Sequence, residues 1–255
     1  MKIGAYQFDV SGNIEENFRI IQNAVHQAHE AGVQLLVFPE CALTGYPPLC
    51  IPSSDAVDFC KLAEAEAQLQ KMADETSMCF VAGSIAQDTG AYHNSARIFT
   101  PGRQHVYHKR ALWGWDRDNF VPGNCSGIFE FEQMKFGVRL CYEIRFPEYF
   151  RELYKAHTDL NIVLFHDVAA EDDQERYDLI RAHIRTRAAE NVCPILSVNA
   201  VVPFQTAPTM LCDHSGEMLA ESKRGNTGLL LYDIDKTALN FSDTGRKCIS
   251  DLLQE

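Results

Sequence analysis

The sequence lacks long apolar runs, clusters of basic residues and paired cysteine motifs. No stretch of the 255 residues approaches the roughly 20 consecutive apolar residues that a membrane-spanning helix needs, and the N-terminus begins like a strand rather than a signal peptide. A formal net charge of −12 without any Lys/Arg cluster disfavours phosphate backbones and anionic lipids as partners. These absences predict a cytoplasmic protein that binds neither membrane nor nucleic acid.

Cysteine pairs are missing as well, although cysteine itself is not rare. The nine cysteines are odd in number, scattered along the chain and without Cys-x-x-Cys spacing, which favours reduced thiols in a cytosol. Zinc-like ligand spacing is also absent. His26 and His29, like His105 and His108, have no further ligands at suitable spacing, so we expect no metal and assign these histidines structural or solvated roles.

No linker, internal repeat or low-complexity segment divides the chain, so we expect residues 1–255 to form one domain. At this length, folding buries roughly 70 to 75% of the unfolded surface, which is enough for a large core. Apolar residues at helical spacing predict helices over 14–31 and 56–73, and we expect two further helices over 147–156 and 173–191. Apolar runs bounded by turn residues predict strands over 2–9, 34–38, 79–86, 92–100, 104–107, 128–131, 136–140, 160–165, 195–201, 209–212, 218–221 and 228–233.

The order of these elements indicates the fold class. The first strand, helix and strand form a βαβ unit whose second strand is apolar throughout, as in a sheet covered on both faces. Hairpin-type turns at Asp88-Thr89-Gly90 and Pro101-Gly102 then add antiparallel strands, so the sheet is mixed. Two β-rich halves with helices on their outer faces predict an α/β fold, a four-layer α-β-β-α sandwich with mixed sheets.

Three reactive side chains, Glu40, Lys109 and Cys141, each follow a predicted strand. A carboxylate at a buried strand end suits a general base, a lysine can supply positive charge to an oxyanion, and a strand-to-helix turn exposes a nucleophilic thiol. Each residue also has a structural alternative: a turn-capping carboxylate, a solvated lysine and a buried cysteine that packs as a small hydrophobe. Together they are the parts of a cysteine hydrolase that needs no histidine. A class I glutaminase is excluded because it needs a His-x-Glu sequence, which does not occur in this chain.

Several motifs carry a resemblance to a known family, in the same order along the chain. They are Leu35-Leu36-Val37-Phe38-Pro39-Glu40 with Leu43-Thr44-Gly45-Tyr46, Tyr107-His108-Lys109, Phe120-Val121-Pro122-Gly123, Gly137-Val138-Arg139-Leu140-Cys141-Tyr142-Glu143-Ile144-Arg145-Phe146-Pro147-Glu148, and Arg185-Thr186-Arg187-Ala188-Ala189-Glu190-Asn191. With these motifs the chain resembles the nitrilase superfamily of carbon–nitrogen hydrolases over nearly its whole length. The resemblance implies the α-β-β-α fold, with Glu40 as base, Lys109 as oxyanion stabiliser and Cys141 as nucleophile. It also implies an oxyanion contact from the backbone N–H of Tyr142.

One position departs from the family pattern. The family usually has a second glutamate shortly before the Pro-Gly pair, and this chain has Asp116 there. Aspartate keeps the charge but is one methylene shorter. We therefore expect Asp116 to orient Lys109 and the substrate nitrogen, with Trp115 or a water filling the gap.

The resemblance also bears on the substrate. True nitrilases typically have tryptophan and then glutamate after the cysteine, whereas Cys141-Tyr142-Glu143 is similar to the amidase branches, including the ω-amidase-like group. We expect a small linear amide that is cleaved through a thioester without a cofactor; an N-carbamoyl amine or N-carbamoyl amino acid is the alternative. Arg117, Arg145 and His166 are candidate contacts for a substrate carboxylate.

The family resemblance further implies a homodimer or larger homo-oligomer, packed through the predicted helices 147–156 and 173–191. A non-catalytic member that keeps the fold as a binding module is the alternative of another class. Because all three triad positions are occupied, we favour the enzyme.

Overall fold

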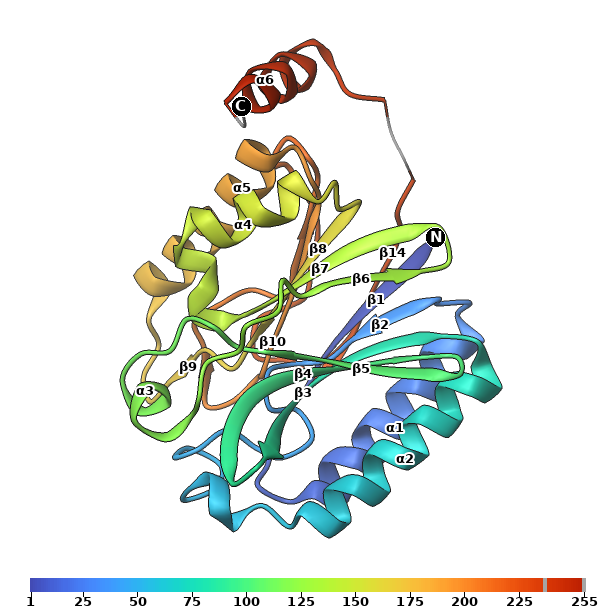
Figure 1. The fold of residues 1–255 in the computed structure, drawn as a ribbon, viewed down its shortest axis with the longest axis vertical. Coiled ribbons are helices and arrows are strands. Elements are labelled where there is room, and N and C mark those ends of the chain that lie inside the picture. The colour runs from blue at the N-terminus through green and yellow to red at the C-terminus, as the bar shows by residue number, and fades with distance from the viewer. Residues whose placement is uncertain (236–237, 254–255) are drawn as a thin grey trace.

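Two six-stranded sheets stacked face to face form the centre of this computed structural model, which describes residues 1–235 and 238–253. Helices cover the outer face of each sheet, so the layers run helix, sheet, sheet, helix (Figure 1). This architecture confirms the predicted α-β-β-α sandwich.

The first sheet mixes parallel and antiparallel pairs, as predicted. Its order is β14-β1-β2-β3-β4-β5, with parallel pairing among β1, β2 and β3 and antiparallel pairing elsewhere. Its strands are β1 (Lys2–Gln7), β2 (Leu35–Val37), β3 (Cys79–Asp88), β4 (Ala91–Thr100), β5 (Arg103–His108) and β14 (Gly228–Asp233). Helices α1 (Ile14–Glu30) and α2 (Phe59–Thr76) lie side by side on its outer face (Figure 1). The side chain of Asn13 caps α1 by accepting two backbone N–H bonds from its first turn.

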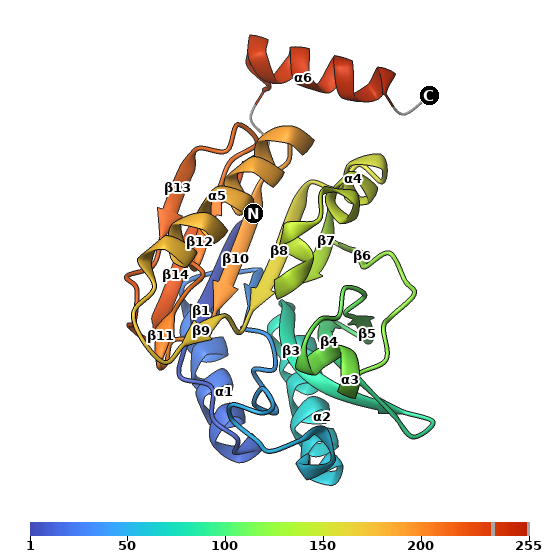
Figure 2. The ribbon, with the colours of Figure 1, turned by 90° about the vertical axis from the view of Figure 1, so that its left-hand side faces the viewer.

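The second sheet has the order β13-β12-β10-β8-β7-β6, with β7, β8 and β10 parallel and the other neighbours antiparallel. Its strands are β6 (Ile128–Phe131), β7 (Met134–Leu140), β8 (Leu160–Phe165), β10 (Ile195–Asn199), β12 (Met210–Cys212) and β13 (Met218–Glu221). Helices α4 (Pro147–Lys155) and α5 (Gln174–Asn191) cover it (Figure 2). The smaller elements are η1 (Ser54–Ala56), η2 (Cys141–Arg145), α3 (Trp115–Asn119), and a ribbon of β9 (Val168–Ala169) and β11 (Phe204–Gln205). Within the described ranges, none of the helices is both long enough and apolar enough to cross a bilayer.

The apolar cluster between the two sheets anchors the strand ends that lead to the reactive residues. Val37 of β2, Tyr107 of β5 and Leu140 of β7 all belong to this one cluster, and each is fully buried. Burying a large apolar side chain contributes about 1.5–3 kcal/mol to folding. The same burial that stabilises the sandwich therefore fixes where the three strands end.

Two helices differ from the prediction. The short helix α3 lies between the predicted strands 104–107 and 128–131, and a further helix, α6 (Phe241–Leu252), follows the last strand. Helix α3 has only five residues, too few to show a periodic pattern. Helix α6 contains Gly245 and several Ser, Thr and Asp residues, which have low helix propensity.

Helix α6 is amphipathic, but its polar side faces the rest of the chain and its apolar side faces outward. It stands at one end of the molecule, beyond the ends of α4 and α5 (Figures 1 and 2). Its buried residues are the polar Asp243 and Ser250, whereas Phe241, Ile249 and Leu252 are 97%, 59% and 64% exposed. A surface helix normally turns its apolar stripe toward the core. The outward apolar face of α6 thus lacks cover within the described part of the chain.

Candidate active site

The predicted triad positions meet where strands of both sheets end. Glu40 follows β2 and Lys109 follows β5 of the first sheet, whereas Cys141 follows β7 of the second. The backbone N–H of Glu40 donates to the carbonyl of Phe165 at 3.2 Å, and Phe165 ends β8, the neighbour of β7. This hydrogen bond joins the two sheets at the site.

The carboxylate of Glu40 is fully buried and has hydrogen-bond donors on both oxygens. Oε1 accepts from the side-chain amide of Asn94 at 2.8 Å and from the ammonium of Lys109 at 2.9 Å. Oε2 accepts from the backbone N–H of His166 at 2.9 Å. Burial raises the pKa of Glu40 and the charge of Lys109 opposes that rise. Glu40 is therefore fixed in place by hydrogen bonds and is more basic than an exposed carboxylate.

The ammonium of Lys109 lies between two carboxylates. Its Nζ is 2.9 Å from Oε1 of Glu40 and 2.7 Å from Oδ2 of Asp116, and all three groups are buried. Burial by itself disfavours the ammonium, but Glu40 and Asp116 outweigh it and raise the pKa of Lys109 well above the ordinary value. A lysine ammonium has three N–H donors, and these carboxylates take two. Within residues 1–235 and 238–253, the third donor has no hydrogen-bond acceptor.

Asp116 lies in helix α3 and reaches Lys109 directly. Its second oxygen, Oδ1, accepts a hydrogen bond of 2.6 Å from the hydroxyl of Tyr46. Trp115 instead packs edge-on against Phe120, with ring centroids 5.5 Å apart. The partner that completes the shorter acidic side chain is therefore Tyr46 rather than Trp115.

Cys141 occupies a turn that few residues other than glycine adopt. It begins η2 directly after β7, and its φ of +41° lies in the left-handed region. Such backbone strain persists only where the surroundings hold it, and it gathers at functional sites. Burial raises the pKa of the Cys141 thiol, Glu40 raises it further, and Lys109 opposes both. At neutral pH the thiol is protonated, so its attack on a substrate requires a base.

Strand β3 holds the Glu40 turn through its backbone at Gly83. The N–H of Gly83 donates to the carbonyl of Pro39 at 3.0 Å, and its carbonyl accepts from Leu43 at 3.0 Å. A Cβ at Gly83 would lie 2.2 Å from the nitrogen of Cys41. Only glycine therefore lets β3 approach the turn that closely.

The three residues that the sequence suggests as contacts for a substrate carboxylate lie in different surroundings. His166 is buried, and burial lowers the pKa of its imidazole to about 4, so the ring is neutral at neutral pH. Arg117 is exposed on α3, with its guanidinium 6.0 Å above the ring of Trp113. Arg145 is partly buried, 5.9 Å above the ring of Tyr142.

The structure adds a cation that the sequence did not suggest. Arg176 lies in the first turn of α5, and its Nε and Nη2 both contact Oδ1 of Asp167 at 2.9 Å. Asp167 directly follows His166, whose N–H holds Glu40, and the side chain of Arg176 is 47% exposed. Burial opposes the charge of Arg176, but its contact with Asp167 outweighs burial and raises the pKa of the guanidinium. Arg176 is thus a partly exposed cation beside the site.

Asn94 and Tyr46 are the other site residues that the sequence analysis missed. Tyr46 lies in one of the recognised motifs, but its contact with Asp116 joins residues far apart in the chain. Asn94 is a fully buried amide inside β4, and a buried polar residue in an apolar strand is a usable signal. Its amide donates to Glu40, and its backbone carbonyl accepts the N–H of Lys109 at 2.8 Å, next to the pairing of β4 with β5.

Comparison with known proteins finds one family over most of the chain. The sequence model of the carbon–nitrogen hydrolase family matches residues 2–240. The chain is 28% identical to a 2-oxoglutaramate amidase of Bacillus subtilis (strain 168) over 249 residues, which is 91% of this chain and 90% of the relative. It is 26% identical to omega-amidase NIT2 of Xenopus tropicalis over 58% of this chain, and this match spans only 56% of the relative's length.

Solved structures of an amidase from Nesterenkonia sp. AN1 share the fold. A variant of that enzyme in complex with butyramide aligns with a TM-score of 0.80 at 22% identity, over 92% of this chain and 90% of that chain. Another, in which the acetamide moiety of fluoroacetamide is covalently added at the active-site cysteine, aligns with a TM-score of 0.83 at 21% identity, over 100% and 95% of the two chains. At this level of identity the likeness shows the fold.

Replacing Lys109 by methionine should destabilise the protein and change how its stability depends on pH. The variant leaves two buried carboxylates without their cation, which costs about 3–5 kcal/mol of unfolding free energy. Without the cation the folded-state pKa of Glu40 rises further above its unfolded value, so the folded state binds more protons and stability falls as pH rises. Denaturant unfolding at several pH values should show the deficit shrinking toward acid pH. Lys135→Met, in a largely exposed pair with Glu130, is the control and should change stability little. Equal, pH-independent losses in both variants would contradict the expectation.

Proposed function

We propose that this chain, which belongs to the carbon–nitrogen hydrolase family, hydrolyses the C–N bond of small linear amides and releases ammonia or an amine. The observation that carries the proposal is the buried contact of Lys109 with both Glu40 and Asp116 beside the Cys141 turn. Together with the thiol of Cys141, this contact brings a base, an oxyanion donor and a nucleophile to one place. The names of the amidase relatives support the same bond and substrate class.

The first half of the reaction forms a thioester. Glu40 takes the proton of the Cys141 thiol, and the thiolate attacks the amide carbon. The free N–H of Lys109 and the backbone N–H of Tyr142 bind the oxyanion of the tetrahedral intermediate. Protonated Glu40 then gives its proton to the leaving nitrogen, the C–N bond breaks, and ammonia or an amine departs.

The second half regenerates the enzyme. Glu40, again ionised, takes a proton from water, and the resulting hydroxide attacks the thioester carbon. The same two donors stabilise the second oxyanion. The C–S bond breaks, the thiolate takes the proton back from Glu40, and a carboxylic acid leaves. Asp116 and Tyr46 keep Lys109 charged and in place throughout.

We assign Arg176 as the contact for a carboxylate at the far end of the substrate, ahead of the three candidates from the sequence. Its Nε and Nη2 are engaged by Asp167, and Nη1 has no partner among the described residues. The name of the Bacillus relative specifies an amide that also carries a carboxylate. A guanidinium suits such a group because it can bind both carboxylate oxygens.

We propose that the protein is a homo-oligomer that resides in the cytosol. The outward apolar face of α6 supports assembly, because exposed apolar surface of this kind is usually covered by a partner. Arg246 of α6 donates to the carbonyl of Ala189 in α5, so α6 is attached beside a helix of the predicted interface. All nine cysteines are unpaired, which supports a reducing compartment.

Cys141→Ala should abolish amide hydrolysis and trap no acyl-enzyme, because the thioester cannot form. An ammonia-release screen over linear mono-amides, ω-amides of dicarboxylates, carbamoyl amines and nitriles measures this. Cys41→Ala is the matched control, since Cys41 is a buried thiol next to Glu40 with no role in the scheme. Turnover that survives Cys141→Ala would refute the mechanism. Turnover of carbamoyl compounds alone would favour the carbamoyl hydrolase, and none with any substrate would favour a binding module.

Arg176→Gln should raise KM for ω-amides of dicarboxylates while leaving KM for butyramide nearly unchanged. A charge-assisted hydrogen bond of about 1.5–3 kcal/mol corresponds to a loss of roughly 10- to 100-fold. Steady-state kinetics with the two substrates measure the difference, and Arg176→Lys should restore part of it. Arg117→Gln and Arg145→Gln are the controls. An equal loss for both substrates would show that Arg176 acts only through the fold.

Sedimentation velocity tests the assembly. We expect a dimer or larger species, and Phe241→Ser combined with Leu252→Ser should shift the distribution toward monomer because both residues lie on the exposed face of α6. The doubly substituted chain should keep its unfolding profile, since neither side chain is buried in the monomer. A profile that contains only monomer would remove the proposal.

A further inference from the structure

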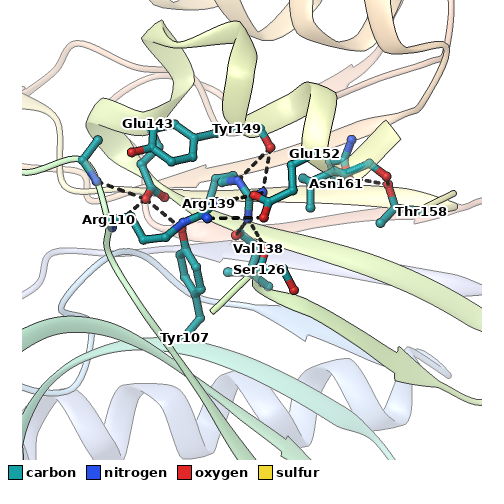
Figure 3. A network of polar contacts seen from close by, with 12 residues as sticks. Tyr107, Arg110, Ser126, Val138, Arg139, Glu143, Tyr149, Glu152, Thr158 and Asn161 are labelled. Carbon is teal, nitrogen blue, oxygen red and sulfur yellow. Dashed lines mark hydrogen bonds and ion pairs between the residues drawn. The ribbon is translucent and has the colours of Figure 1, made fainter. Parts of the chain in front are cut away.

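A second carboxylate, that of Glu143, joins the segment of Lys109 to the segment of Cys141. Glu143 lies in η2, two residues after Cys141, and it is fully buried. Figure 3 shows it between the end of β7 and the chain that leaves β5. The mechanism above gives this carboxylate no chemical step.

Each oxygen of Glu143 holds a different segment. Oε2 accepts the backbone N–H of Leu140 at 2.7 Å, and Leu140 directly precedes Cys141. Oε1 accepts the backbone N–H of Arg110 at 2.8 Å, and Arg110 directly follows Lys109. The hydroxyl of Tyr107 also donates to Oε1, at 2.7 Å. One side chain therefore spans from the residue beside the thiol to the residue beside the ammonium.

The hydrogen-bond partners of Glu143 fit a carboxylate, which only accepts, and do not fit a neutral side chain of the same shape. Its partners are all donors, three backbone N–H groups and one hydroxyl. A glutamine at this position would have to point its NH₂ either at the N–H of Leu140 or at the N–H groups of Arg110 and Ala111. Two donors cannot bond to each other, so one of the two links must open. A carboxylate is the side chain that keeps both.

A second group of charged side chains, which is centred on Glu152, fixes the same strands from the side away from the site. Arg139 of β7 is fully buried and donates to the carbonyl of Tyr149 and to Glu152, and Arg110 also pairs with Glu152 (Figure 3). These contacts tie β7 and the Lys109 segment to α4. They involve no backbone group next to Cys141 or Lys109, and Glu152 is 36% exposed. Glu152 is therefore a natural control for Glu143.

We propose that Glu143 is a positioning residue that sets the place of the Lys109 ammonium relative to the Cys141 thiol. The proposal rests on the hydrolase mechanism above, in which the ammonium must meet an oxyanion on the carbon that the thiolate attacks. Its action passes through the backbone on either side, because Leu140 and Arg110 are each one peptide bond from a reacting residue. The positive φ of Cys141 makes such support necessary, since a strained turn relaxes when its hydrogen bonds are lost.

The test compares Glu143→Gln with Glu152→Gln. With butyramide as substrate, Glu143→Gln should lower kcat on the order of 100-fold, the effect of a misplacement of about 1 Å, with KM nearly unchanged. The second readout is the rate at which iodoacetamide alkylates Cys141, followed by mass spectrometry as a function of pH. If Lys109 moves away from the thiol, the pKa of Cys141 rises, and the alkylation profile shifts to higher pH. Glu152→Gln should keep both the kcat and the profile.

Three results would overturn the proposal: an unchanged kcat, an unchanged alkylation profile in Glu143→Gln, or an equal effect in Glu152→Gln. The alkylation profile needs no turnover, so it reports on Glu143 even if Cys141→Ala disproves amide hydrolysis. Where Glu143→Gln does not fold, Tyr107→Phe removes a single donor to Oε1 and keeps the backbone links. It should shift the profile in the same direction by less, and no shift at all would count against the proposal.

Discussion

The structure of this site depends on one buried cation shared by two carboxylates. Lys109 is taken out of water, at a cost of several kcal/mol that only close and well-oriented anions offset. Glu40 and Asp116 come from different parts of the chain, so the loop after β2 and helix α3 must both converge on the end of β5. Removing Lys109 leaves two carboxylates in the interior without their cation. The geometry of the site is thus enforced by the energetics of burial.

The stacked sheets bring the three triad positions together at strand ends. Strands of both sheets share one apolar cluster, and Glu40, Lys109 and Cys141 are each within three residues of a strand end in it. Polar links then set the fine spacing: the Glu40 N–H to Phe165 between the sheets, and the Glu143 carboxylate between β7 and the Lys109 segment. The core determines which residues meet, and the buried hydrogen bonds determine how far apart they lie.

The sequence predicted the part of this arrangement that is local. Strand-end positions of Glu40, Lys109 and Cys141 follow from apolar runs, and helices α1 and α2 follow from periodicity, because each pattern is contained in a short window. The contacts of Asn94 with Glu40 and of Tyr46 with Asp116 join residues 54 and 70 positions apart, which no window contains. Arg176 and Asp167 are only nine residues apart, but no pattern of apolar residues marks their ion pair. Helix α6 was not predicted for another reason. Its polar side faces the rest of the protein, which is the reverse of the pattern by which surface helices are recognised.

The burial that assembles the site also fixes the charge of four of its ionisable groups. It lowers the pKa of His166 to about 4 and raises those of the Cys141 thiol and the Tyr46 hydroxyl, while its two carboxylates raise that of Lys109. None of these four groups then gains or loses a proton when the pH drifts moderately around neutrality. A substrate approaching this site therefore meets the same imidazole, thiol, phenol and ammonium across the ordinary range of cellular acidity.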